Sequence, residues 1–317
     1  MTTGSRQPSN WPLAGGLVAG VIADALLGDP ARRHPVGLFG QAVTGLERRV
    51  YADNRCHGAA FTGASVLLAL APAAAALRLT RRNAAGRLAV AATATWAVTG
   101  ARSLAMEAAR IQRLLAAGDL PAARQFLPHL CGRDPAELDW TGIARAVVES
   151  VAENTSDAIV APLLWGALTG PAGLTGYRAV NTIDAMVGHH SPRYERFGWA
   201  SARLDDLANW APAQVTALLA GVCSPAVGGN PVVTWQTARS FGPAHPSPNA
   251  GWCEAAFAGA LGVQLGGTLS YAGRTEHRPI LGAGPPPGPT DIARAIRLSR
   301  AITTVMTPLA AAVALAD

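Results

Sequence analysis

The feature that most constrains the fold is a series of long apolar runs that carry almost no charge. A helix needs roughly 20 apolar residues, within a range of about 17–25, to cross the hydrocarbon core of a bilayer. The runs that reach or approach this length are Trp11–Leu27, Ala59–Leu77, Leu88–Ala101, Ala158–Tyr177, Leu207–Gly221, Ala255–Gly273 and Ala301–Ala316. Because so many such runs rarely occur together in a soluble domain, the sequence predicts an all-α, polytopic membrane helical bundle. A soluble helical bundle with alanine-rich core helices is the alternative.

Glycine and proline divide these runs further. The pairs Gly16/Gly20 and Gly262/Gly266 have the spacing that lets membrane helices approach closely. Ala158–Tyr177 contains Pro162, Gly170, Pro171 and Gly173, which favours a re-entrant or broken helical hairpin. If this run crossed the bilayer, the acidic clusters on either side of it would lie about 30 Å apart. We therefore predict that it does not cross, and we expect a similar break between Ser224-Pro225 and Pro231.

Two stretches differ from the apolar runs. Residues 104–149 are charged and amphipathic, which predicts a polar helical hairpin within the bundle. The stretch Gly282–Pro289, "GAGPPPGP", is expected to be a loop. No internal repeat or linker is visible, so residues 1–317 are interpreted as a single membrane-embedded domain.

Composition excludes several classes of protein. Charged residues make up only 15% of the chain, against about 25% in a typical soluble protein. The net charge is +6, but the arginines are scattered and form no basic stripe with interleaved aromatics, so nucleic-acid binding is not expected. The four cysteines lack disulfide or zinc spacing and are expected to be free thiols. Ser5–Pro12 is polar, and no cleavable signal is expected.

Polar side chains cluster at the edges of the apolar runs. Glu149, Glu153 and Asp157 recur every four residues and form one acidic stripe on a helix, where like charges repel. The other clusters contain Asp29, Arg32, Arg33 and His34; Arg178, Asn181 and Asp184; Arg203, Asp205, Asp206 and Asn209; and Asn249 within "SPNAGW". Any one cluster could be a solvated helix end. Acids with asparagine beside arginine, however, are what a magnesium–phosphate site requires, because Mg²⁺ prefers oxygen ligands and arginine clamps phosphate.

Four motifs make the sequence specific. They are "GDPARRHPV" from Gly28, "VESVAENTSDAIVAPLLW" from Val148, "YRAVNTIDAMVG" with "RYERFGWASARLDDLANWAPA" from Tyr177, and "SPNAGW" with "AAFAGALGVQLGG" from Ser247. Over about Gly28–Gly273 the chain resembles the cobalamin biosynthesis protein CobD/CbiB family, which contains the adenosylcobinamide-phosphate synthases.

The resemblance implies a multi-pass enzyme of the cell membrane. Its expected reaction joins an amino-alcohol phosphate, either aminopropanol phosphate or ethanolamine phosphate, to the propionate carboxylate of adenosylcobyric acid, with ATP and Mg²⁺. Candidate catalytic carboxylates are Glu149, Glu153, Asp157, Asp184, Asp205 and Asp206, of which Glu153, Asp157, Asp205 and Asp206 are candidate magnesium ligands. Candidate substrate-binding residues are Asp29, His34, Asn154, Arg178, Asn181, Arg203, Asn209 and Asn249.

Two other functions fit the residues without the resemblance. One is an intramembrane, magnesium-dependent prenyl or phospho-alcohol transferase, although "LDDLAN" only partly matches the aspartate motifs of such enzymes. The other is a non-enzymatic transporter, in which the broken Ala158–Tyr177 segment would line a pathway. The sequence contains no P-loop or glycine-rich dinucleotide motif, so ATP binding would be non-standard.

Overall fold

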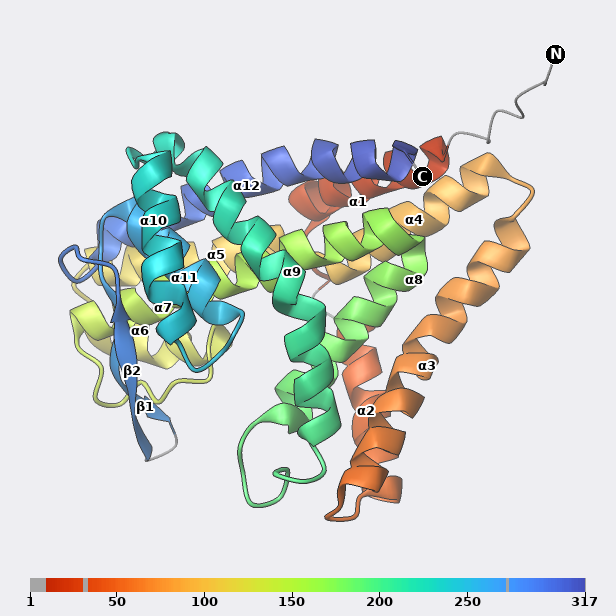
Figure 1. Ribbon diagram of the computed structural model, residues 1–317, viewed down its shortest axis with the longest axis horizontal. Helices are drawn as coiled ribbons and strands as arrows, with labels where there is room; N and C mark the ends of the chain where they lie inside the picture. The colour runs from red at the N-terminus through yellow and green to blue at the C-terminus, as the bar shows by residue number, and fades with distance from the viewer. Residues whose placement is uncertain (1–9, 31–33, 272–273, 317) are drawn as a thin grey trace. The chain divides into compact units, whose positions relative to one another are not determined.

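The computed structural model describes residues 10–30, 34–271 and 274–316, and these are helical almost throughout, which confirms the all-α prediction. The α-helices are α1 (Trp11–Leu27), α2 (Pro35–Val50), α3 (Arg55–Thr80), α4 (Ala84–Val98), α5 (Ala101–Ala116), α6 (Leu120–Phe126), α7 (Trp140–Thr155), α8 (Ala161–Ile183), α9 (Trp199–Cys223), α10 (Pro231–Phe241), α11 (Ala250–Leu261) and α12 (Pro289–Ala316) (Figure 1). Short turns are η1 (Leu127–His129), η2 (Ser156–Val160), η3 (Asp184–Gly188), η4 (Ser224–Val227) and η5 (Gly242–Ala244); η2 and η3 are π-helical.

The chain divides into two compact units. Unit 1 comprises Met1–Gly100, Ala161–Ala208 and Met306–Asp317, and unit 2 comprises Ala101–Val160 and Asn209–Val305. Helices α9 and α12 each contribute to both units. The single membrane-embedded domain expected from the sequence stays a prediction.

In unit 1, α1 packs closely along α4. A Cβ atom added to Gly16 would lie 2.4 Å from Ala91 Cβ, and one added to Gly20 would lie 2.4 Å from Thr95 Cβ. The contacts ascend together along both helices, so α1 and α4 run in the same direction. This confirms the close helix approach predicted for the first glycine pair, because no larger residue fits there.

In unit 2, α11 is the central helix and packs against α7, α10 and a β-hairpin. Ten of its twelve residues are buried, and all of them except Glu254 are apolar, as expected for a helix surrounded by protein. The polar hairpin predicted for residues 104–149 corresponds to α5 and α6, which turn at Gly118 and pack against α7. Gly118 has a φ of +81°, a conformation that glycine adopts without strain.

Two of the apolar runs are not continuous helices. Helix α11 ends at Leu261, where Gly262 is left-handed (φ +67°), and the chain continues as the antiparallel strands β1 (Leu265–Tyr271) and β2 (Arg274–Leu281). The predicted helical run Ala255–Gly273 and the pairing of Gly262 with Gly266 are therefore wrong. The run Leu88–Ala101 is interrupted as well, because α4 ends at Val98 and the backbone of Thr99 is extended.

The predicted breaks are confirmed. Helix α8 is interrupted at Gly170, whose φ of +68° and ψ of −154° are not helical, and Pro171 follows. A pocket of about 240 Å³ borders this break, lined by Arg87, Thr169 and Gly170 among others. The chain also turns at Gly228 between η4 and α10. That Ala158–Tyr177 does not cross the bilayer stays a prediction.

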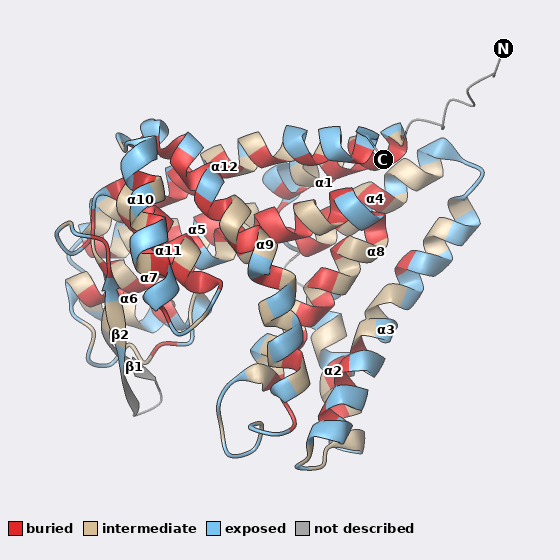
Figure 2. Ribbon diagram, in the orientation of Figure 1, coloured by how far each residue is buried: buried red, intermediate tan, exposed pale blue. Residues whose placement is uncertain are grey.

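The helices that are long and apolar enough to span a bilayer support the membrane assignment. Within the described chain they are Arg55–Thr80, Trp140–Gly188, Trp199–Val227 and Pro289–Ala316. Helix α1 is apolar but shorter. Figure 2 shows α3 largely exposed, and its Leu67 and Leu79 side chains are 66% and 87% exposed. Such apolar surface is typical of a helix in contact with lipid rather than water.

A glycine in α3 tests the packing of unit 1. A Cβ atom added to Gly58 would lie 1.9 Å from the carbonyl oxygen of Phe197, whereas one added to Gly63 would meet nothing within 4 Å. We expect Gly58→Ala to destabilise the protein by about 1–3 kcal/mol, because backbone must move to admit the methyl group. The matched control Gly63→Ala should leave stability unchanged or raise it. Thermal unfolding in detergent measures both, and equal melting temperatures would contradict this packing.

Candidate functional site

The predicted acidic stripe lies in unit 2, on helix α7 and the turn that follows it. Asp139 caps the helix by accepting a hydrogen bond from the backbone N–H of Gly142 (2.7 Å). Glu149 and Glu153 follow one turn apart, and Asp157 lies in the π-helical turn η2, a conformation frequent at functional sites. Glu149 is buried, Glu153 is exposed and Asp157 is half-buried. The stripe thus runs from the interior of the unit to an accessible surface.

Glu149 joins three segments of unit 2. Its carboxylate accepts hydrogen bonds from the Arg133 guanidinium, in the segment before α7, and from the backbone N–H of Gly266 in β1 (2.6 Å). Glu149 and Arg133 are only 2% and 6% exposed. A buried carboxylate with these donors is fixed in place, and loss of either partner would leave a buried polar group unpaired. These contacts position the hairpin, and the catalytic role predicted for Glu149 stays a prediction.

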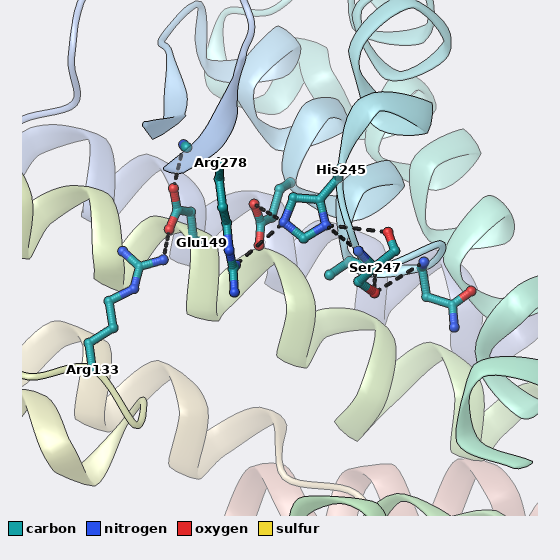
Figure 3. A network of polar contacts seen from close by, with 9 residues as sticks. Arg133, Glu149, His245, Ser247 and Arg278 are labelled. Atoms are coloured by element: carbon teal, nitrogen blue, oxygen red, sulfur yellow. Dashed lines mark hydrogen bonds and ion pairs between the residues drawn. The ribbon is translucent and has the colours of Figure 1, made fainter. Parts of the chain in front are cut away.

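A second acidic group faces this stripe from α11. Figure 3 shows Arg278 of β2 and His245, from the segment before α11, beside the Glu149 group. His245 Nε2 lies 3.8 Å from Glu254 Oε2 and 3.4 Å from Arg278 Nη1. The His245 and Glu254 side chains are each 2% exposed. Within the described chain, Glu254 Oε2 accepts no hydrogen bond.

The other nitrogen of His245 is held by backbone. Nδ1 accepts a hydrogen bond from the N–H of Ser247 (3.0 Å), and the carbonyl of Ser247 lies 3.3 Å from the same nitrogen (Figure 3). Ser247 Oγ also accepts hydrogen bonds from the N–H groups of Asn249 and Ala250. Ala250 is the first residue of α11.

Burial determines the protonation of Glu254. Desolvation raises the pKa of this carboxyl well above its ordinary value, and the nearby Glu149 and Glu153 carboxylates raise it further. The Arg278 and Arg133 guanidinium groups oppose the rise. Glu254 therefore holds its proton to higher pH than an exposed glutamate does.

Three other predicted residues, Asn154, Asn209 and Asn249, also belong to unit 2. The side-chain amide of Asn154 donates to the carbonyl oxygen of Ser150 (2.9 Å). Asn249 and Asn209 are buried. Their predicted substrate contacts stay predictions.

The remaining predicted residues belong to unit 1. Arg178 Nη1 donates to Asn181 Oδ1 (3.5 Å), and Asp184 begins the π-helical turn η3. Arg203 and Asp206 form an exposed ion pair (3.9 Å), with Asp205 half-buried beside them. An exposed pair of this kind contributes little to stability.

His34 and Asp29 pair at 3.3 Å, and His34 Nδ1 caps α2 by accepting the Val36 N–H. Capping accounts for this histidine without a substrate. Arg32 and Arg33 lie outside the described residues.

The acidic residues do not form a ready-made metal cage. No group of three or more histidine, cysteine, aspartate or glutamate side chains converges in the part of the chain that the structure describes. Mg²⁺, however, is usually bound through one or two protein carboxylates together with waters and substrate phosphates. Glu153 is exposed and Asp157 is half-buried one helical turn away, so the donor set fits Mg²⁺ carried by a phosphate substrate.

Sequence reasoning missed four members of the network, Arg133, His245, Glu254 and Arg278. Glu254 gave a usable signal, because it is the only charged residue between His245 and Arg274. A lone acid within an apolar helix is costly and tends to be functional. The two arginines gave no signal, because their positions depend on the hairpin and on a loop.

The fold and this network define a membrane-helical protein with a buried polar site in one unit. The model of the CobD/Cbib protein family matches residues 17–299. "Cobalamin biosynthesis protein CobD" of Mycobacterium tuberculosis (strain ATCC 25618 / H37Rv) is 50% identical over 93% of this chain and 94% of its own length. The protein of the same name from Chromobacterium violaceum is 42% identical over 88% of this chain and 89% of its own. No solved structure matches. The chain belongs to the CobD/Cbib family.

The raised pKa of Glu254 predicts how stability depends on pH. A carboxyl whose pKa is higher in the folded state than in the unfolded state destabilises the fold progressively as pH rises above the unfolded value. We therefore expect Glu254→Gln to raise the melting temperature relative to the original protein, by an amount that grows from pH 5 toward neutral pH. The exposed Glu137→Gln is the control. Parallel melting curves for Glu254→Gln and the original protein across this range would contradict the burial of a titrating carboxyl.

Proposed function

We propose that this protein is the amide-forming enzyme of cobalamin biosynthesis that makes adenosylcobinamide phosphate. It would join an amino-alcohol phosphate to the propionate carboxylate of adenosylcobyric acid, with ATP as co-substrate and Mg²⁺. Family membership supports the role in cobalamin biosynthesis. The observation that supports the specific amide-forming reaction is the polar network of unit 2, in which carboxylates and arginines lie close together around α7 and α11.

The amino-alcohol phosphate carries both signs of charge. Its ammonium group matches a site with more carboxylates than arginines, and its phosphate matches arginine. The network offers Glu149, Glu153 and Glu254 against two arginines, and Arg133 already pairs with Glu149. The remaining carboxylates favour a cation, and the exposed Glu153 is where a ligand from outside the protein can reach them.

Activation of the carboxylate requires nucleotide and metal. A carboxylate does not condense with an amine in water until it is activated, most simply as an acyl phosphate made from ATP. Glu153 and Asp157 would hold Mg²⁺ in unit 2. The proposed acidic groups of unit 1 are Asp184, Asp205 and Asp206. Arg178 and Arg203 would bind phosphate. Mg²⁺ would supply charge neutralisation for the transferring phosphoryl group.

Polar groups beside apolar surface suit the proposed substrates and location. The corrinoid is large, and the proposed cell-membrane location would let one face of the site exclude water from the activated acyl group. A transporter is the second candidate, favoured by the pocket beside the break at Gly170. A prenyl or phospho-alcohol transferase would also use acidic clusters with Mg²⁺. The three functions differ in whether the protein consumes ATP, the corrinoid and the amino-alcohol phosphate together.

The deciding experiment uses purified protein in detergent with adenosylcobyric acid, ethanolamine phosphate or aminopropanol phosphate, ATP and Mg²⁺. Formation of adenosylcobinamide phosphate together with ADP is expected, with no product when any component is omitted. Consumption of ATP that does not depend on the corrinoid, or the absence of an amide product with both amino alcohols, would contradict the proposal.

Glu153 tests the acidic stripe. We expect Glu153→Gln to lower turnover by about 100-fold or more, because the neutral amide is a poor ligand for a cation. The melting temperature should stay close to that of the original protein, since the side chain is exposed. Glu137→Gln, exposed in the segment before α7, is the control that should keep full activity. Full activity of Glu153→Gln would remove the stripe from the mechanism.

A further inference from the structure

Glu254 is the one buried carboxylate of the network whose Oε2 atom accepts no hydrogen bond within the described chain. Its side chain is 2% exposed, and His245 Nε2 lies 3.8 Å from its Oε2. Glu149, equally buried, is instead saturated by Arg133 and the Gly266 N–H. Two carboxylates on facing helices therefore differ in availability, since one is fixed by its partners and the other keeps a free lone pair in a dry environment.

His245 packs against this carboxylate. Its Nε2 lies 3.8 Å from Glu254 Oε2, beyond hydrogen-bond distance, and Arg278 Nη1 lies 3.4 Å from the same nitrogen. The Ser247 N–H donates to Nδ1 and fixes the position of the ring. The ring therefore covers one side of Glu254 and leaves Oε2 able to take a proton.

Amide formation requires a proton acceptor. An aliphatic ammonium group has a pKa of about 10 and is almost wholly protonated at neutral pH, when it cannot attack a carbonyl. In the reaction with an acyl phosphate, the C–N bond forms and the C–O bond to phosphate breaks, with the electron pair leaving on phosphate. The ammonium nitrogen begins with three protons and the amide nitrogen keeps one. The leaving phosphate takes one of the other two, and a protein group must take the second.

We propose that Glu254 is the general base that removes this proton from the ammonium group of the amino-alcohol phosphate, and that His245 is its positioning residue. The inference rests on the proposed amide-forming function and adds the identity of its base. The proton passes from the ammonium nitrogen to Glu254 Oε2, directly or through one water, and then to solvent by way of the exposed side of the stripe at Glu153.

Burial supports this role. A glutamate is an effective base near neutral pH when burial lifts its pKa toward that pH, and burial does raise the pKa of Glu254. The charged groups that act on it are Glu149 and Glu153 of α7, Arg133 before α7, and Arg278 of β2, with His245 in contact. The Arg278 and Arg133 guanidinium groups oppose the rise in the pKa of Glu254, which favours loss of the proton to solvent after each turnover.

The test compares two amines that differ in acidity. 1-Amino-2-propanol phosphate and its 3,3,3-trifluoro analogue differ only in the methyl group, where fluorine makes the ammonium group more acidic and its deprotonation easier. With 1-amino-2-propanol phosphate, Glu254→Gln should lower kcat by about 100-fold or more with little change in KM. With the trifluoro analogue the loss should shrink by about tenfold or more. An equal loss of kcat with both amines, or a loss expressed only in KM, would overturn the role as base.

His245 is tested by the pH profile. Removing the ring opens one side of Glu254 to water and lessens its desolvation, so His245→Ala should move the acidic limb of kcat/KM to lower pH. His245→Gln, which refills most of the volume, should restore part of the shift. The exposed His129→Gln is the control. An unmoved limb in His245→Ala would remove the positioning role.

Two further measurements separate the possible failures. Thermal unfolding of each variant in detergent shows whether it folds, and Glu254→Gln is expected to fold because it removes a buried titrating group. If the original protein makes no amide product, the proposed function itself is wrong. If the original protein and Glu254→Gln are equally active, only the assignment of the base is wrong.

Discussion

The polar interior of unit 2 depends on the buried contact of Glu149 with Arg133 and the Gly266 N–H. It ties a loop, a helix and a strand together at one buried carboxylate. A buried ion pair is weak support for stability in itself, because desolvation offsets much of the attraction. Its value here is geometric, since it fixes where β2 and therefore Arg278 lie, and Arg278 in turn faces His245.

Because of this contact, the three glutamates of unit 2 have different surroundings and therefore different roles. Glu149 is committed to structure, Glu153 is accessible, and Glu254 is buried with an unused lone pair. All three are glutamates in helices of one unit, and only their surroundings distinguish them. The same principle separates acid from base in enzymes that use paired carboxylates, where environment rather than residue type decides the role.

Local sequence patterns predicted those structural features that depend only on residues close together in the chain. Helix α3, the break at Gly170 and the glycine contact of α1 follow from hydrophobicity, backbone preference and side-chain size. The hairpin was missed because its apolar run continues that of α11, and only the left-handed Gly262 marks the change. The stripe at Glu149 and Glu153 was readable from its period, whereas Arg133 and Arg278 enter the site through a loop and a strand, which no helical period reveals.

The packing of α1 has a consequence for how the chain is assembled. Its Gly16 and Gly20 fit only against Ala91 and Thr95, and α2 and α3 are made in between. At about 5–20 residues per second, synthesis of α4 lags that of α1 by several seconds. During this interval the glycine face of α1, which is buried in the finished fold, lacks its native neighbour on α4. The first apolar helix of the chain is therefore made several seconds before the helix that covers its glycine face.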